Sequence, residues 1–123
     1  MTFKELAEKQ LQYEMASCNS FSDAFSKDPA QALDNCDSTY EHANRVLIIR
    51  RVLSSLANAE TKGETEQSRV SFLRDFFNKQ IHTFARWPRK STSVTSNLSH
   101  QAELSAMVEM VELIDGWMNS ASC

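Results

Sequence analysis

The clearest pattern in the chain is the recurrence of hydrophobic residues at spacings of three and four, which is the period of an amphipathic helix. At the start, Thr2 and Glu5 have the spacing of a capping box, which begins a helix. The apolar stripe that follows consists of Phe3, Leu6, Ala7, Leu11, Met15 and Cys18. We therefore predict a helix over residues 2–18 with one buried face, ending near Asn19 and Ser20.

The stretch after this helix has a less regular pattern, and residues 20–28 are predicted to form a connector. Asp28 and Pro29 then give a helix start, because aspartate is a good N-cap and proline suits the first helical position. A second start signal, serine followed three residues later by glutamate, lies at 38–41. The sequence leaves open whether the second main helix begins near 29 or near 38.

Three further helices are predicted, over residues 38–60, 65–87 and 99–119. Gly63 suits a left-handed C-terminal cap after the first of them. Pro88 ends the second, because the residue before a proline is pushed out of the helical conformation. The chain contains only two glycines and two prolines, which also favours long helices over strands and turns.

The predicted fold class is all-α, an antiparallel four-helix bundle in a single domain over residues 1–123, with room for an additional short helix between residues 20 and 37. The methionines of the last helix, Met107, Met110 and Met118, are expected to fill its core. The predicted centre of the core is Leu6, Leu11, Ile49, Leu53, Leu56, Leu73, Phe77, Ile81, Phe84, Val111 and Ile114.

Charge is segregated along the chain, although the formal net charge is only −3. Residues 1–44 carry three basic and eight acidic side chains, a balance of −5. Residues 45–90 carry ten basic and four acidic side chains, a balance of +6. Residues 91–123 carry four acidic side chains and no lysine or arginine. Such segregation steers partners and orients assembly, so the basic middle segment is the first place to look for a functional surface.

No constellation in the sequence predicts a metal or a cofactor. Bundles that hold two iron ions need Glu-x-x-His twice, whereas His100 and Glu103 give the reversed order once. Glu41 and His42 are adjacent, so they point to different faces of a helix. Neither Cys-x-x-Cys nor His-x-x-x-His is present for zinc. We therefore expect no metal site and no cofactor.

Catalysis is not expected either. Cys18 lies on the apolar stripe of its helix and is interpreted as a small buried hydrophobe. The three cysteines, Cys18, Cys36 and Cys123, are widely spaced. We therefore expect no disulfide framework, which favours reduced thiols in the cytoplasm. The chain shows neither a secretory signal pattern nor a long apolar run, so we also expect no membrane segment.

Two groups of residues are candidates for contact with a partner. The end of the third main helix brings together Arg86, Trp87, Arg89 and Lys90, a combination that suits a protein interface or single-stranded nucleic acid. The same residues also have a purely structural interpretation, because the helix dipole stabilises cations at the C-terminal end of a helix.

The second candidate group is a stripe opposite the main apolar face of the second helix. It consists of Tyr40, Ala43, Leu47, Arg50 and Arg51, of which all but Ala43 are candidate contact residues. A helix that is apolar on two sides is either central in its bundle or packed on a partner. Helical geometry further predicts that Tyr40, Arg45 and Arg86 lie at one end of the bundle and form a single basic patch.

These observations favour a non-enzymatic protein-binding module, an adaptor, inhibitor or assembly subunit that docks on a protein partner. The alternative is a small subunit that binds the nucleic-acid backbone through the basic segment 45–90. An isoelectric point near 5.6 speaks against that alternative, because nucleic-acid-binding domains are usually basic overall. A homo-oligomer is left open.

Overall fold

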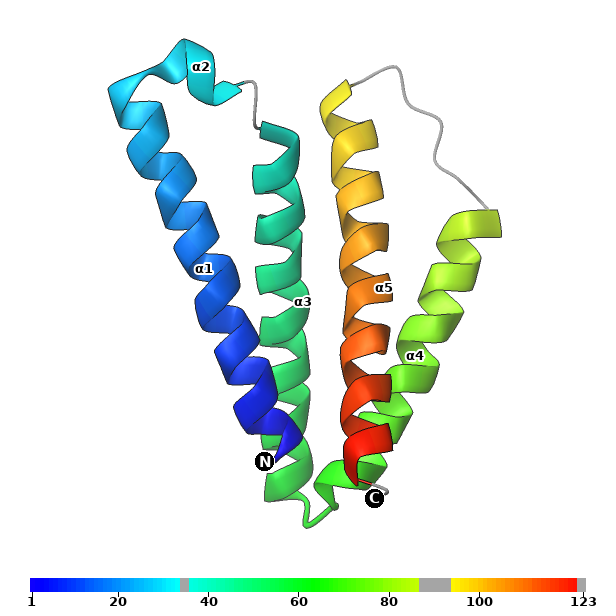
Figure 1. Ribbon diagram of the computed structural model, residues 1–123. Coiled ribbons are helices and arrows are strands. Elements are labelled where there is room, and N and C mark those ends of the chain that lie inside the picture. Colours follow the sequence, from blue (N-terminus) through cyan, green and yellow to red (C-terminus); the bar gives the residue numbers. More distant parts are fainter. Residues whose placement is uncertain (34–35, 87–93, 122–123) are drawn as a thin grey trace.

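The computed structural model describes residues 1–33, 36–86 and 94–121, and within these ranges it contains five helices and no strand (Figure 1). The helices are α1 (Phe3–Lys27), α2 (Pro29–Leu33), α3 (Cys36–Thr61), α4 (Glu66–Arg86) and α5 (Val94–Ala121). The predicted all-α fold class is thus confirmed, including the short extra helix between residues 20 and 37.

The four long helices alternate in direction and form an antiparallel bundle (Figure 1). Helix α3 is central, because it packs against α1, α5 and α4, and α5 packs in turn against α4. Both termini and the α3–α4 turn lie at one end, where the helices converge. Helix α2 and the start of α5 lie at the opposite end, where α1 and α4 are far apart.

The core runs along the inner faces of all four long helices. Its buried members are Phe3, Ala7, Ile48, Ile49, Val52, Leu56, Val70, Leu73, Phe77, Ala106, Met107, Met110 and Ile114. Every residue predicted for the centre of the core either belongs to this cluster or packs against it partly buried, and Met118 does the latter. The interpretation of the last helix's methionines as core residues is confirmed for Met107 and Met110.

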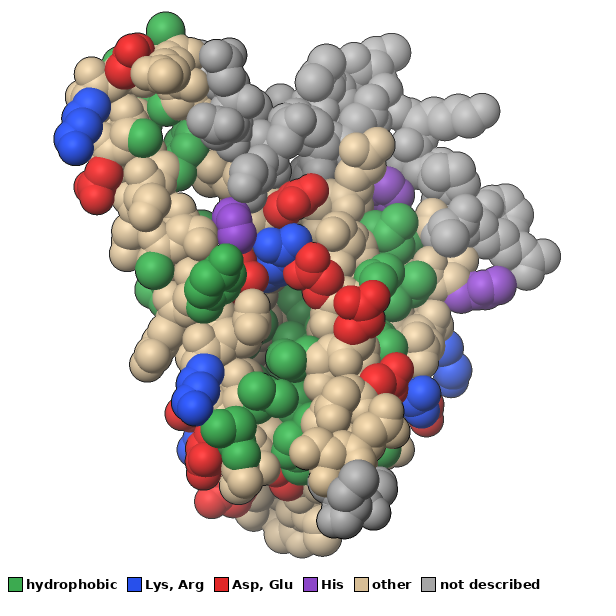
Figure 2. Space-filling model, in the orientation of Figure 1, with side chains coloured by type: hydrophobic (Ala, Val, Ile, Leu, Met, Phe, Trp, Pro, Cys, Tyr) green, Lys and Arg blue, Asp and Glu red, His purple; other side chains and the backbone are tan. Residues whose placement is uncertain are grey.

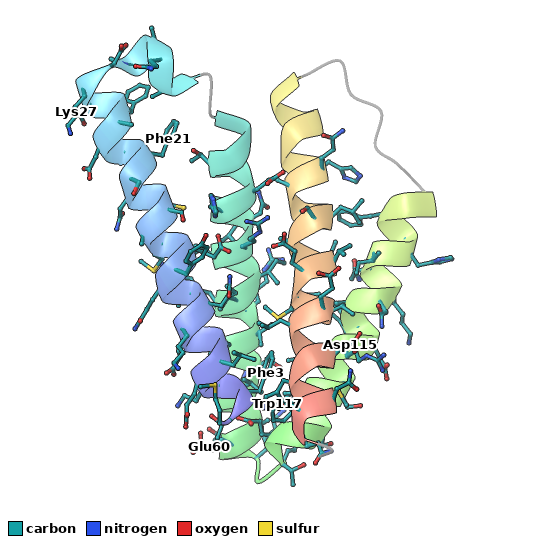
Figure 3. The ribbon with its side chains drawn as sticks, in the orientation of Figure 1. Phe3, Phe21, Lys27, Glu60, Asp115 and Trp117 are labelled. Atoms are coloured by element: carbon teal, nitrogen blue, oxygen red, sulfur yellow. The ribbon has the colours of Figure 1, made fainter. Side chains whose placement is uncertain are left out.

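The start of α1 is tied to two other helices. The Thr2 hydroxyl accepts a hydrogen bond from the Glu5 N–H at 3.1 Å, as the predicted cap requires. Glu66 of α4 accepts from the Phe3 N–H at 2.8 Å, which satisfies another unpaired donor of the first turn. The Trp117 indole donates to the Met1 carbonyl at 3.1 Å and packs edge-on against Phe3, side by side in Figure 3.

Helix α1 is longer than the sequence predicted. It does not end near Ser20 but continues through the expected connector as far as Lys27. The hydroxyls of Ser17, Ser20 and Ser26 each donate to a carbonyl four residues earlier, so this serine-rich stretch satisfies its polar groups within the helix. The break comes only at Asp28, where the following proline excludes the helical conformation.

The start near 29 belongs to the short helix α2, whereas the second main helix begins two residues before the serine of the start signal at 38–41. Asp28 caps α2, with its carboxylate accepting from the Gln31 N–H at 3.2 Å, and α3 begins separately at Cys36. Helix α5 begins at Val94 rather than at Ser99, because nothing in the intervening sequence breaks a helix: it contains neither proline nor glycine.

Gly63 ends α3 as predicted. It has a φ of 75°, and the N–H groups of Gly63 and Glu64 donate to Glu60 and Ala59 at 3.1 and 2.9 Å. These are the two hydrogen bonds of a Schellman motif, whose left-handed residue favours glycine.

Phe77→Ala should lower the free energy of unfolding by about 3–5 kcal/mol, because it removes a large, almost fully buried side chain from the centre of the core. The matched control is Phe72→Ala on the same helix, where the ring is 58 % exposed and the loss should stay below about 1 kcal/mol. Urea denaturation of both variants measures the difference. Equal losses would contradict the placement of α4.

Candidate functional site

Large hydrophobic side chains are exposed on the neighbouring helices α3 and α4. Phe72 and Phe76 of α4 are 58 % and 45 % exposed, and Leu47 of α3 is 51 % exposed. Arg50 and Arg51 are exposed on the same helix as Leu47. We call these five residues the α3–α4 face. Single exposed hydrophobes are common on protein surfaces, but several beside one another favour an interaction site.

A groove of about 310 Å³ lies within this face, between α3 and α4. Ile48 and Arg51 line it from α3, while Glu103 and Met107 of α5 line it from behind. Its α4 side is formed by Phe72, Leu73, Phe76, Phe77 and Gln80. The groove therefore reaches from the exposed phenylalanines down to core residues, and a partner could bury apolar side chains there.

A second groove, of about 320 Å³, lies on the other side of the α3 ridge. Met15 and Cys18 line it from α1, and Leu47 and Arg50 line it from α3. The Arg50 guanidinium lies 3.9 Å from the Met15 sulfur. Leu47 and the two arginines that follow it thus form a ridge with an apolar hollow on each side.

Three of the arginines in the basic middle segment are neutralised by carboxylates. Arg45 contacts Glu14, Glu41 and Glu109, which come from α1, α3 and α5. Arg69 pairs with Glu64 at 2.6 Å, and Arg74 pairs with Asp115 at 2.5 Å. By contrast, the described cations of this segment that form no ion pair with a residue that the structure describes are Arg50, Arg51, Lys62 and Lys79.

Of the predicted basic patch of Tyr40, Arg45 and Arg86, the structure describes the side chain of Arg45. The start of α3 and the end of α4 do lie at the same end (Figure 1), but the charge of Arg45 is used by its three carboxylates. Tyr40 and Arg86 belong to α3 and α4, and their side chains lie outside the described part, as do the predicted contact residues Trp87, Arg89 and Lys90. Of the predicted site residues, the structure places Leu47, Arg50 and Arg51 together on an exposed surface.

A buried polar cluster connects α1, α3 and α5, and sequence reasoning missed it. Glu14 is only 1 % exposed. Its carboxylate contacts the His42 imidazole, accepts from the Gln10 side-chain amide at 3.0 Å and lies 3.7 Å from the Arg45 guanidinium. Arg45 also donates to Glu109 at 2.6 Å. Figure 2 shows acidic side chains gathered around basic and histidine side chains in this region.

The spacing of Glu14 was the signal that could have revealed this cluster. Glu14 follows Phe3 and Ala7 at intervals that place all three on one face of α1, and these are the buried residues of that helix. Met15, assigned to the stripe from sequence, is 38 % exposed instead. A carboxylate at a core position requires a cationic or hydrogen-bonding partner, so its presence predicts contacts such as those with His42 and Arg45.

Within the described ranges, the structure contains neither a cluster of metal-binding side chains nor a helix suited to crossing a membrane. The side chains described there bring no three histidines, cysteines, aspartates or glutamates together in a way that could hold a metal ion. His100 instead stacks on Phe84, with ring centroids 4.8 Å apart. Among the helices as described, none combines the length and the apolar character needed to cross a bilayer.

Comparison of the chain with protein-family models, with curated proteins and with solved structures found no match in any of the three.

Arg45→Leu should lower the free energy of unfolding by about 3 kcal/mol, because it leaves the buried Glu14 carboxylate without its guanidinium partner. Arg50→Leu is the matched control, since Arg50 is exposed and should change stability by less than about 0.5 kcal/mol. Urea denaturation distinguishes the two. An Arg45 variant as stable as the control would show that the cluster contributes nothing to the fold.

Burial raises the pKa of the half-buried Cys18 thiol, and the negative charge of nearby Glu14 raises it further. Because the pKa of this thiol is higher in the folded protein than in the unfolded chain, the thiol contributes to stability at pH values below the unfolded-state pKa. That contribution is lost as the pH rises through the folded-state pKa. In a variant with Cys36 and Cys123 replaced by serine, alkylation of Cys18 by iodoacetamide should therefore rise at higher pH in the folded protein than in urea. Coincident pH profiles would contradict this environment.

Proposed function

We propose that this protein is a small helical binding module that docks a protein partner on its α3–α4 face. The observation that carries the proposal is the pair of exposed phenylalanines, Phe72 and Phe76, at the edge of a groove that reaches the core. Exposed aromatic side chains and arginines are the commonest energetic anchors of protein interfaces. Adaptor, inhibitor and assembly subunit are all roles that such a module can serve.

The charge of the face indicates the chemistry of the partner. Arg51 lines the groove between α3 and α4, whereas Arg50 lines the groove on the other side of the α3 ridge. Neither forms an ion pair with a residue that the structure describes. A partner segment with apolar side chains flanked by carboxylates would fill the groove and pair with these arginines. An amphipathic helix meets both requirements, because it can insert an apolar stripe into a groove between two helices.

Binding to the nucleic-acid backbone is the less supported alternative. Three arginines of the basic segment, Arg45, Arg69 and Arg74, already have carboxylate partners within the chain. Backbone binding depends on several free cations and loses affinity steeply as salt is added. The α3–α4 face combines exposed phenylalanines with few free cations, and this combination suits apolar docking better than binding to a nucleic-acid backbone.

The test compares the wild-type chain with the double variant Arg51→Glu, Phe72→Ser as affinity baits in lysate of the native host, with and without nuclease. Both positions are exposed, so the melting temperature should change little. A partner that survives nuclease should be captured by the wild type and lost, by about tenfold or more, with the double variant. Lys62→Glu is the matched control, because it reverses an exposed cation away from the face and should retain the partner.

Two outcomes would overturn the proposal. The first is equal capture by the wild type and the double variant, which would place the contact elsewhere. The second is loss of every partner on nuclease treatment, combined with a steep salt dependence of binding, which would favour the nucleic-acid alternative.

A further inference from the structure

A third groove lies between α1 and α5, with α3 behind it, away from the α3–α4 face. Its first part, of about 370 Å³, lies beside the polar cluster, with Gln10 and Glu14 on one side and Glu109 on the other. Its second part, of about 420 Å³, continues towards Trp117. Glu112 and Leu113 line both parts, so the two form one groove, which we call the α1–α5 groove.

The groove is long enough for a helical segment. Along α5 its lining runs from Ala106 to Ser120, which corresponds to about 20 Å at 1.5 Å per residue. Its floor is apolar and consists of Leu6, Ile48, Ile49, Met110, Leu113 and Trp117. Figure 2 shows this side of the molecule, with hydrophobic side chains in the centre and acidic side chains bordering them.

The polar side chains of the groove are predominantly acidic. Three carboxylates line it, Glu14, Glu109 and Glu112, against one cation, Arg45. Arg45 is already paired with Glu14 and Glu109, so Glu112 is the lining carboxylate that has no ion pair with a residue that the structure describes. The α5 side carries no lysine or arginine at all, because the chain has none after residue 90. The groove therefore complements a cationic occupant.

Gly116 supplies an independent observation. It lies within α5 and lines the groove, and a Cβ atom added to it would meet no atom within 4 Å. Among the described residues only Gly63 has a positive φ, so Gly116 is not required by the backbone either. Glycine destabilises a helix interior relative to alanine, and a close approach of another backbone is a common reason for its presence.

From these observations we infer that the α1–α5 groove binds a cationic amphipathic helix of a partner protein. Its apolar stripe lies on the floor between Leu6 and Leu113, and its lysine or arginine side chains face the unpaired Glu112. The backbone of the bound helix passes closest to α5 at Gly116. This site is separate from the α3–α4 face and has the opposite charge preference, so it does not depend on the proposed function of that face.

The probe is a synthetic peptide of about 18 leucines and lysines, long enough to span the groove and arranged to place leucine on one helical face. A peptide of the same composition in permuted order, without an apolar face, is its control. Isothermal titration calorimetry with the full chain should detect binding of the first peptide and not of the second. Equal affinities would reduce the effect to bulk charge and overturn the inference.

Two substitutions locate the site. Gly116→Leu fills open space, so it should keep or raise the melting temperature while weakening peptide binding about tenfold or more. Glu112→Lys should weaken it through charge reversal. The matched controls are Ser54→Leu and Asp75→Lys, both exposed on other helices and expected to change the affinity less than about twofold. Gly116→Ala, the smaller change, should raise the melting temperature and weaken binding less.

The remaining outcomes also decide the question. Unchanged affinity in Gly116→Leu, or the same loss in Asp75→Lys as in Glu112→Lys, would overturn the groove as the binding site. A concentration-dependent dimer in sedimentation that Gly116→Leu abolishes and the peptide does not displace would assign the groove to a second copy instead. The double variant Arg51→Glu, Phe72→Ser should still bind the peptide, which separates this inference from the proposed function.

Discussion

The burial of the Glu14 carboxylate constrains how α1 packs on the rest of the bundle. Glu14 occupies a core position of α1 and is almost fully withdrawn from solvent, so it must face groups that compensate its charge. His42 and Arg45 of α3 provide that compensation, and Glu109 of α5 holds the outer side of the same guanidinium. A different rotation or register of α1 would bury the carboxylate without partners. The polar cluster thus selects one arrangement of three helices that hydrophobic contacts alone would leave less defined.

The same cluster changes the meaning of the segregated charge. Along the sequence, a basic segment between two acidic ones suggests attraction to other molecules. In the fold, much of that attraction is internal, because Arg45 pairs with carboxylates of α1 and α5 and Arg74 pairs with Asp115 of α5. The charges that remain available to partners are Arg50 and Arg51, on the same face as the exposed phenylalanines, and Glu112 of α5 in the α1–α5 groove.

The sequence predicted most of the fold, because long apolar stripes and strong breakers are local signals. Gly63 and the Asp28–Pro29 pair marked boundaries that the helices respect, and the stop predicted at Pro88 lies outside the described residues. The end predicted for α1 was wrong, because serines can satisfy their hydroxyls inside a helix. For the candidate site, exposure of Leu47 and Arg51 followed from the face of α3 on which they lie. The ion pairs of Arg45 did not, because they join residues as far apart in sequence as Glu14 and Glu109 and depend on how the helices pack.

The groove between α3 and α4 and the α1–α5 groove share a lining residue of the central helix α3. Ile48 of α3 is 2 % exposed, yet it lines both the groove between α3 and α4 and the α1–α5 groove. One side chain therefore forms part of the wall of each site, packed as tightly as the core around it. An occupant that keeps Ile48 in its present position leaves the other groove unchanged, and the two affinities are then independent. An occupant that displaces Ile48 alters the floor of the second groove, and the resulting coupling must be equal in both directions, since linkage between two binding equilibria is reciprocal. If two partners bound both grooves at once and one displaced Ile48, this shared wall would couple their binding through α3.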